Sequence, residues 1–134
     1  MNDYTNDITL IDLYYQRINF FNLKSMTKEQ IKLNVNHKYE FQKSNDLKNI
    51  RLVIKTTIKD ENNRFSFELE SVAIFGVKNE IDFSDFDLQK YLVSIAWPFV
   101  RQEVQLVTTQ PGIMPIVLPI NVMFNQRDSQ DMYA

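Results

Sequence analysis

Residues 30–41, QIKLNVNHKYEF, carry the pattern on which the fold of this chain depends. Their odd-numbered positions are apolar or aromatic, apart from His37, and their even-numbered positions are polar. Successive side chains of a strand point to opposite faces, so this alternation is typical of a strand that buries one face and exposes the other. The stretch therefore predicts an antiparallel strand that carries His37 on its apolar side.

Three neighbouring segments extend the pattern into a sheet. Residues 49–59, NIRLVIKTTIK, and 64–77, RFSFELESVAIFGV, alternate in the same way and are separated by polar turn sequences. From Val72 onward the second of them is apolar on both sides, which predicts that both of its faces are covered. Residues 8–23 are apolar and aromatic on both sides and predict one long or bulged strand. Together the segments predict a four-stranded antiparallel meander over about residues 8–77.

The period changes to that of a helix after residue 83. Apolar side chains recur at helical spacing through residues 84–109, and Ser84 or Asp85 is suited to cap the first turn. Pro98 interrupts this run, and an interior proline costs about 3 kcal/mol. We therefore expect a short irregular or helical piece before Trp97, within a helical region over 84–109, and a main helix over about 98–109. An extended apolar segment (110–124) and a polar tail (125–134) follow, giving a single α+β domain over residues 1–134.

Composition offers little support for catalysis. The chain has no cysteine, one histidine, two glycines and a net charge of −2, which argues against a zinc site, a phosphate-binding loop and a nucleic-acid surface. His37 is predicted to be a packed histidine. The pair Glu68 and Glu70, and the acids between Asp82 and Asp87, fit a solvated sheet face and a helix cap better than acid–base or cation sites. We expect no enzyme activity, no metal and no cofactor.

The stretch PGIMPIVLPINV, residues 111–122, is the most unusual segment. It has no charged residue and holds three of the four prolines of the chain. Prolines prevent it from continuing the helix or forming a central strand. Two interpretations remain open: an extended wall of a binding groove, or a strap that only covers the core. The apolar surplus over what one helix and one sheet can bury favours an oligomer.

The C-terminal half resembles the SecB family of export chaperones. The resemblance is carried by residues 97–122, with Trp97-Pro98-Phe99, then Arg101 and Glu103, a proline-containing apolar stretch and the element Pro119-Ile120-Asn121. The upstream strands are similar to those of the family in order, so the resemblance covers about residues 10–124. It implies a sheet and a long helix assembled as a dimer of dimers, in the cytoplasm. It also implies an ATP-independent holdase that binds unfolded preproteins for export.

The resemblance also implies site residues. Client contacts are expected at Phe21, Ile74, Phe75, Val77, Ile113, Met114, Ile116, Val117, Leu118 and Ile120. The oligomer interface is expected at Phe67, Leu69, Ser71, Trp97, Phe99 and Val104. Glu68 matches an acid that the family uses to dock the motor SecA, whereas Arg17 and Phe21 occupy positions where the family has further acids.

These departures leave the partner open. SecB-like proteins also protect aggregation-prone antitoxins in toxin–antitoxin systems, so an antitoxin is the alternative to preproteins as the client. No direct contact with nucleic acid and no insertion into a membrane is expected, and the acidic N-terminus does not resemble a signal peptide. Two other functional classes are a structural subunit with one folded partner and a small-ligand binder.

Overall fold

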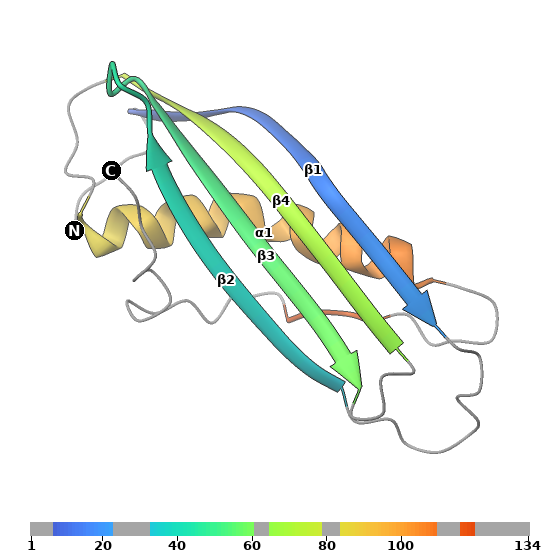
Figure 1. Cartoon of the computed structure of the whole chain (residues 1–134). Helices are drawn as coiled ribbons and strands as arrows, with labels where there is room; N and C mark the ends of the chain where they lie inside the picture. The colour runs from blue at the N-terminus through green and yellow to red at the C-terminus, as the bar shows by residue number, and fades with distance from the viewer. Residues whose placement is uncertain (1–6, 23–32, 61–64, 79–83, 110–115, 120–134) are drawn as a thin grey trace.

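The computed structural model describes residues 7–22, 33–60, 65–78, 84–109 and 116–119. Four strands form one antiparallel sheet: β1 (Ile8–Asn22), β2 (Leu33–Lys43), β3 (Asn49–Asp60) and β4 (Phe65–Val77). One helix, α1 (Phe86–Thr108), crosses a single face of that sheet (Figure 1). The α+β class predicted from the change of period is confirmed.

The order of the strands is β1-β4-β3-β2. The predicted meander therefore holds for β2 to β4, but β1 pairs with β4 at the far side and not with β2. This order places β3 and β4, the two most buried strands, at the centre. Their burial agrees with the prediction that β4 is covered on both faces, since Val72 on the face opposite α1 has 0% of its surface exposed.

Strand β1 is long and bulged, as its sequence predicts. Its pairing with β4 shifts register twice, between Leu10 and Asp12 and again between Tyr15 and Arg17. A bulge inserts one extra residue and bends the strand without ending it. At the first bulge the side chain of Ile11 lies over Gly76, where an added Cβ would come within 2.8 Å of Ile11 Cδ1.

Helix α1 is continuous through Pro98, so the expectation that the main helix begins at about Pro98 is wrong. The side chain of Asp85 caps the helix by accepting a hydrogen bond from the backbone N–H of Asp87 at 3.0 Å. Residues on both sides of the proline, including Trp97 and Val100, are fully packed against the sheet. Burial of these side chains along the whole helix offsets the cost of one interior proline.

The core lies between α1 and the sheet face that carries the odd-numbered positions of β2 and β4 and the even-numbered positions of β3. The opposite face, which we call the outer face, is turned toward the viewer in Figure 1. No helix within the described residues is long and apolar enough to span a bilayer.

Candidate client-binding site

Residues Ile116–Pro119 form an extended segment that lies along α1, and we call this segment the strap. Trp97 Nε1 donates a hydrogen bond to the carbonyl oxygen of Pro119 at 2.9 Å, and Arg101 Nε donates one to the carbonyl oxygen of Leu118 at 2.8 Å. At the other end the backbone N–H of Ile116 donates to Thr108 Oγ1 at 2.9 Å. The strap therefore runs antiparallel to the helix and is held by side chains from three of its turns.

The side chains of the strap alternate between the core and solvent. Leu118 is 4% exposed and belongs to the core, while Ile116 is half-buried against it. Val117 is 55% exposed. An extended backbone places successive side chains on opposite sides, so hydrogen bonding of the backbone to α1 leaves Val117 directed away from the core.

Trp97 connects the strap to the sheet. Its ring is 2% exposed and meets the ring of His37 edge-on, with centroids 4.9 Å apart. Nδ1 of His37 in turn lies 3.0 Å from Thr56 Oγ1 on the neighbouring strand. His37 is thus a packed, half-buried histidine, as predicted. Two residues further along the same face of β2, Val35 is 45% exposed.

Val35 and Val117 are exposed apolar side chains that lie close in sequence to contacts of Trp97, since Val35 stands two residues from His37 and Val117 two residues from Pro119. In extended chain two residues span about 7 Å. Exposed apolar side chains that a partner could bury are candidates for a binding surface. We call Val35, Val117 and the half-buried Ile116 the strap surface, and it is the candidate site for an extended, apolar polypeptide.

The structure separates the expected client-contact residues. Phe21 and Ile74 lie on the outer face, on the side of the sheet opposite the strap, so they do not line one groove with it. Phe75 is 0% exposed and Leu118 is 4% exposed, and in this arrangement neither offers its side chain to a client. Val77 is half-buried at the end of β4. Ile113, Met114 and Ile120 lie outside the described residues.

Five of the six residues expected at an oligomer interface lie inside the chain's own core. Phe67, Leu69, Ser71, Trp97 and Val104 are at most 2% exposed, so α1 and the sheet already cover them. Among the six, Phe99 alone is exposed, at 38%. The alternation along β4 correctly predicts that Phe67, Leu69 and Ser71 share a face. It cannot predict that the helix of the same chain covers that face.

Sequence reasoning expected Phe99 at an oligomer interface but missed two other exposed apolar side chains, Ile18 of β1 and Leu106 of α1. Ile18, Phe99 and Leu106 are all exposed, and we call them the β1–α1 patch. Tyr15 joins the two elements here, because its hydroxyl donates a hydrogen bond to the carbonyl oxygen of Phe99 at 3.0 Å. Burial, and to a lesser degree the Glu103 carboxylate, raise the pKa of Tyr15, which keeps the phenol protonated as a donor. Phe99 and Leu106 are seven residues apart and so lie on the same side of α1, which is the sequence signal that could have indicated this patch.

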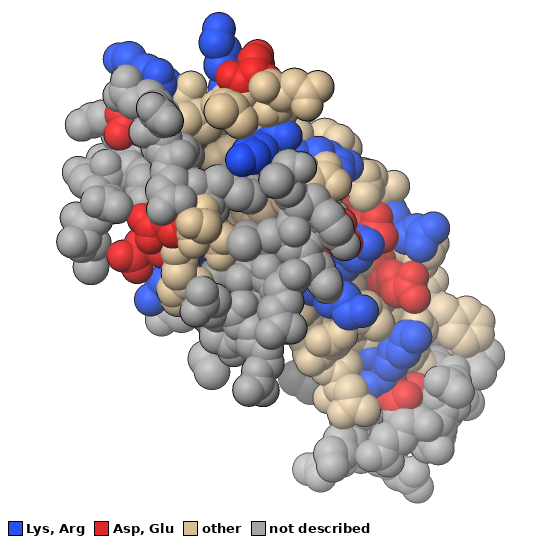
Figure 2. All heavy atoms as spheres, turned by 60° about the vertical axis from the view of Figure 1, so that its left-hand side comes forward, with Lys and Arg blue, Asp and Glu red and all other residues tan. Residues whose placement is uncertain are grey.

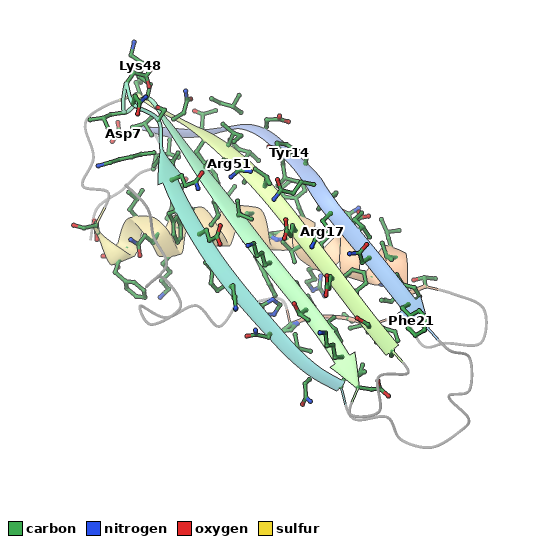
Figure 3. The ribbon with its side chains drawn as sticks, in the orientation of Figure 1. Asp7, Tyr14, Arg17, Phe21, Lys48 and Arg51 are labelled. Atoms are coloured by element: carbon green, nitrogen blue, oxygen red, sulfur yellow. The ribbon has the colours of Figure 1, made fainter. Side chains whose placement is uncertain are left out.

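No cluster of three or more histidine, cysteine or acidic side chains able to hold a metal occurs in the part of the chain that the structure describes. Glu68, the predicted docking acid, lies half-buried on the outer face beside Thr57. Arg17 and Phe21 are exposed on that same face (Figure 3).

Comparison with known proteins identifies the family of this chain. The model of the family described as "Preprotein translocase subunit SecB" matches residues 2–131, nearly the whole chain. The chain belongs to the SecB family. The resemblance inferred from residues 97–122 is thereby confirmed, and SecB-family proteins are chaperones.

One solved structure supports the fold. The SecB-like chaperone Rv1957 of Mycobacterium tuberculosis, in complex with a ChAD peptide from the HigA1 antitoxin, is similar with a TM-score of 0.69 at 12% identity, covering 87% of this chain and 91% of that chain. A protein of unknown function from Streptococcus agalactiae gives a TM-score of 0.47 at 12% identity, covering 84% and 97%. A search of curated proteins found no match.

Proposed function

We propose that this SecB-family chain is an ATP-independent holdase that binds unfolded, aggregation-prone polypeptides, for protein export. The observation that carries the proposal is the strap surface, where an apolar segment is latched to α1 through its backbone while Val117 and Val35 stay exposed. Each large apolar client side chain buried there contributes about 1.5–3 kcal/mol before the cost of ordering the client.

The direct test is aggregation of a chemically denatured client diluted into buffer without nucleotide. We expect one assembled chaperone per client to suppress light scattering to near the baseline. Scattering that is unchanged by an excess of the protein would contradict the proposal, and a requirement for ATP would contradict the passive mechanism.

Val117→Asp tests whether the strap surface binds the client. A carboxylate at this exposed position opposes apolar burial but disturbs little packing, so we expect client affinity to fall about tenfold, since the lost burial and the desolvation of the charge together are worth ~1.4 kcal/mol or more. The free energy of unfolding should change by less than about 0.5 kcal/mol, as for other surface substitutions. Client affinity is measured by fluorescence polarisation of a labelled unfolded peptide.

The matched control for Val117→Asp is Gln102→Asp, at an exposed position on a different side of α1 from Arg101 and Thr108, which hold the strap. It adds the same charge and should leave client binding within twofold. If Val117→Asp binds clients normally, the strap only covers the core and another surface holds them. Leu118→Asp is unsuitable for this test because it places a charge in the core.

We further propose that the protein acts as a cytoplasmic homotetramer, a dimer of dimers, with several client sites that add by avidity. The β1–α1 patch supports this assembly, because it is apolar, and β1 is an edge strand in the described sheet. Phe99→Glu with Leu106→Glu should therefore lower the mass seen by analytical ultracentrifugation at least twofold.

The control for the patch changes net charge by the same amount. Lys90→Gln with Gln105→Glu also makes the chain more negative by two, at exposed positions outside the β1–α1 patch, and should leave the mass unchanged. If both double variants sediment like the parent, the patch is not an assembly interface.

A dedicated antitoxin chaperone is the second candidate. It is favoured by the exposed Arg17 and Phe21, which replace acids on the face where the family docks SecA. Affinity purification of tagged protein from its host, with mass-spectrometric identification, separates the two roles. SecA with many preproteins supports export, whereas one dominant antitoxin-like partner supports the second candidate.

A further inference from the structure

Arg101 is a half-buried cation beside the strap. Its Nε donates a hydrogen bond of 2.8 Å to the carbonyl oxygen of Leu118, and this bond fixes the guanidinium group against the strap backbone. Val117, which is 55% exposed, is the preceding residue of the strap. Consecutive residues of an extended chain are about 3.3 Å apart, so a client residue next to one that packs on Val117 is within reach of a long side chain such as Arg101.

No carboxylate neutralises Arg101 in the part of the chain that the structure describes. Arg101 forms no ion pair there, and the bond to Leu118 is its one hydrogen bond to a described residue. A guanidinium group carries donors on Nε and on both Nη nitrogens, so the Nη donors have no partner among these residues. Partial burial removes part of the hydration of a charge, so a half-buried cation without a counter-ion is unfavourable for the chain alone.

The described acids around Arg101 are directed or engaged elsewhere. Glu103 lies about 200° from Arg101 around the helix axis. After burial, its carboxylate is the second cause of the raised pKa of Tyr15, which places it toward β1. Asp60, at the end of β3, is 4% exposed and its Oδ1 accepts a hydrogen bond of 3.0 Å from the backbone N–H of Phe65. The acids in the middle of β2 and β4 lie on the outer face, across the sheet from the strap.

A carboxylate is the group best suited to Arg101. Its two oxygens can accept parallel hydrogen bonds from a guanidinium group, a pairing that is stronger and more directional than a bond to a neutral carbonyl. A polyanion such as nucleic acid needs an extended basic surface. Over the surface seen in Figure 2, basic and acidic side chains are interleaved instead, and the chain is acidic overall.

We propose that Arg101 selects clients at the strap surface by pairing with a carboxylate that stands next to the apolar side chain packed on Val117. This inference rests on the proposed holdase function and names the class of segment held there: an extended apolar segment that carries an aspartate or glutamate. Arg101 then has two roles, because Nε holds the strap while the Nη nitrogens bind the client.

The test is fluorescence polarisation with two labelled, unfolded apolar peptides of equal length, one with a central glutamate and the other with glutamine in its place. We expect the full-length protein to bind the glutamate peptide about fivefold more tightly at low salt, as for a partly buried ion pair. The preference should fall below about twofold in 1 M salt, where charges are screened over about 3 Å.

Arg101→Gln separates the two roles of the side chain. Glutamine Nε2 occupies the same place along the side chain as arginine Nε, so the bond to Leu118 can be kept while the Nη donors and the charge are lost. We expect the glutamate preference to disappear and hydrogen exchange at the amide of Ile116 to stay as in the parent, which a merely structural role would not allow. The matched control Lys90→Gln removes the same charge at an exposed position of α1 and should keep the preference.

The outcomes distinguish this inference from the proposed function. Tight but equal binding of both peptides would overturn the role of Arg101 and leave the holdase proposal intact. Binding of neither peptide would contradict both. Equal weakening of both peptides by Arg101→Gln would mean that Arg101 binds client backbone carbonyls and not a carboxylate. Should Arg101→Gln fail to fold, the parent alone decides, because a glutamate preference that persists undiminished in high salt is not an ion pair.

Discussion

Replacing Trp97 with alanine should lower the free energy of unfolding by about 3–5 kcal/mol, the usual cost of removing a large buried aromatic side chain. The ring is 2% exposed, meets His37 edge-on, and donates the hydrogen bond that holds Pro119. Urea unfolding at a fixed protomer concentration measures the loss, because the stability of an oligomer depends on concentration.

The same substitution should also release the strap. Without the indole, the carbonyl oxygen of Pro119 loses its donor and Leu118 loses a packing neighbour. Hydrogen exchange at the amide of Ile116, which is bonded to Thr108 Oγ1, reports release directly and should become faster.

Trp97→Phe separates packing from hydrogen bonding in this prediction. It keeps an aromatic ring but removes the N–H, and leaving a polar group unpaired costs about 1–3 kcal/mol. The Trp97→Phe variant should therefore lose less stability than Trp97→Ala. Hydrogen exchange at the amide of Ile116 should still be faster than in the parent protein. If Trp97→Ala unfolds at the same urea concentration as the parent, the ring does not anchor the strap.

Replacing Pro98 with alanine should stabilise the protein by about 1–3 kcal/mol, since proline in a helix interior costs about 3 kcal/mol relative to alanine. Alanine supplies an N–H directed at the carbonyl of Ser94 and removes the clash of the proline ring with that turn. Pro98 is exposed, so no core cavity is created. The increase is measured by urea unfolding under the conditions used for Trp97.

Gln102→Ala is the matched control, because it introduces alanine at an exposed position one turn later without removing a proline. It should shift stability by less than about 0.5 kcal/mol. If Pro98→Ala is no more stable than this control, the helix has already relaxed around the proline at negligible cost.

Several residues expected at an oligomer interface are covered by the chain's own helix. Phe67, Leu69 and Ser71 were correctly grouped, because alternate residues of a strand share a face. The resemblance to the SecB family, and not the strand pattern, placed them at an oligomer interface. A shorter helix would have left part of that face uncovered, whereas α1 extends over 23 residues and closes it.

The sequence by itself determined the local structure and the family. Alternation predicted β2, β3 and β4, and a run of apolar and aromatic residues predicted β1. The shift to helical spacing located α1, and residues 97–122 indicated the SecB family. These features depend on side chains that are near one another along the chain, where the period of two or 3.6 directly reports which side is buried.

Only the tertiary structure decided which surfaces remain free. The pairing of β1 with β4 and the latch from Trp97 to Pro119 join residues distant in sequence. No local pattern encodes such contacts, because they depend on strand order and on which face α1 covers. Periodicity identifies the apolar side of each element, and packing then determines whether that side meets its own chain or a partner.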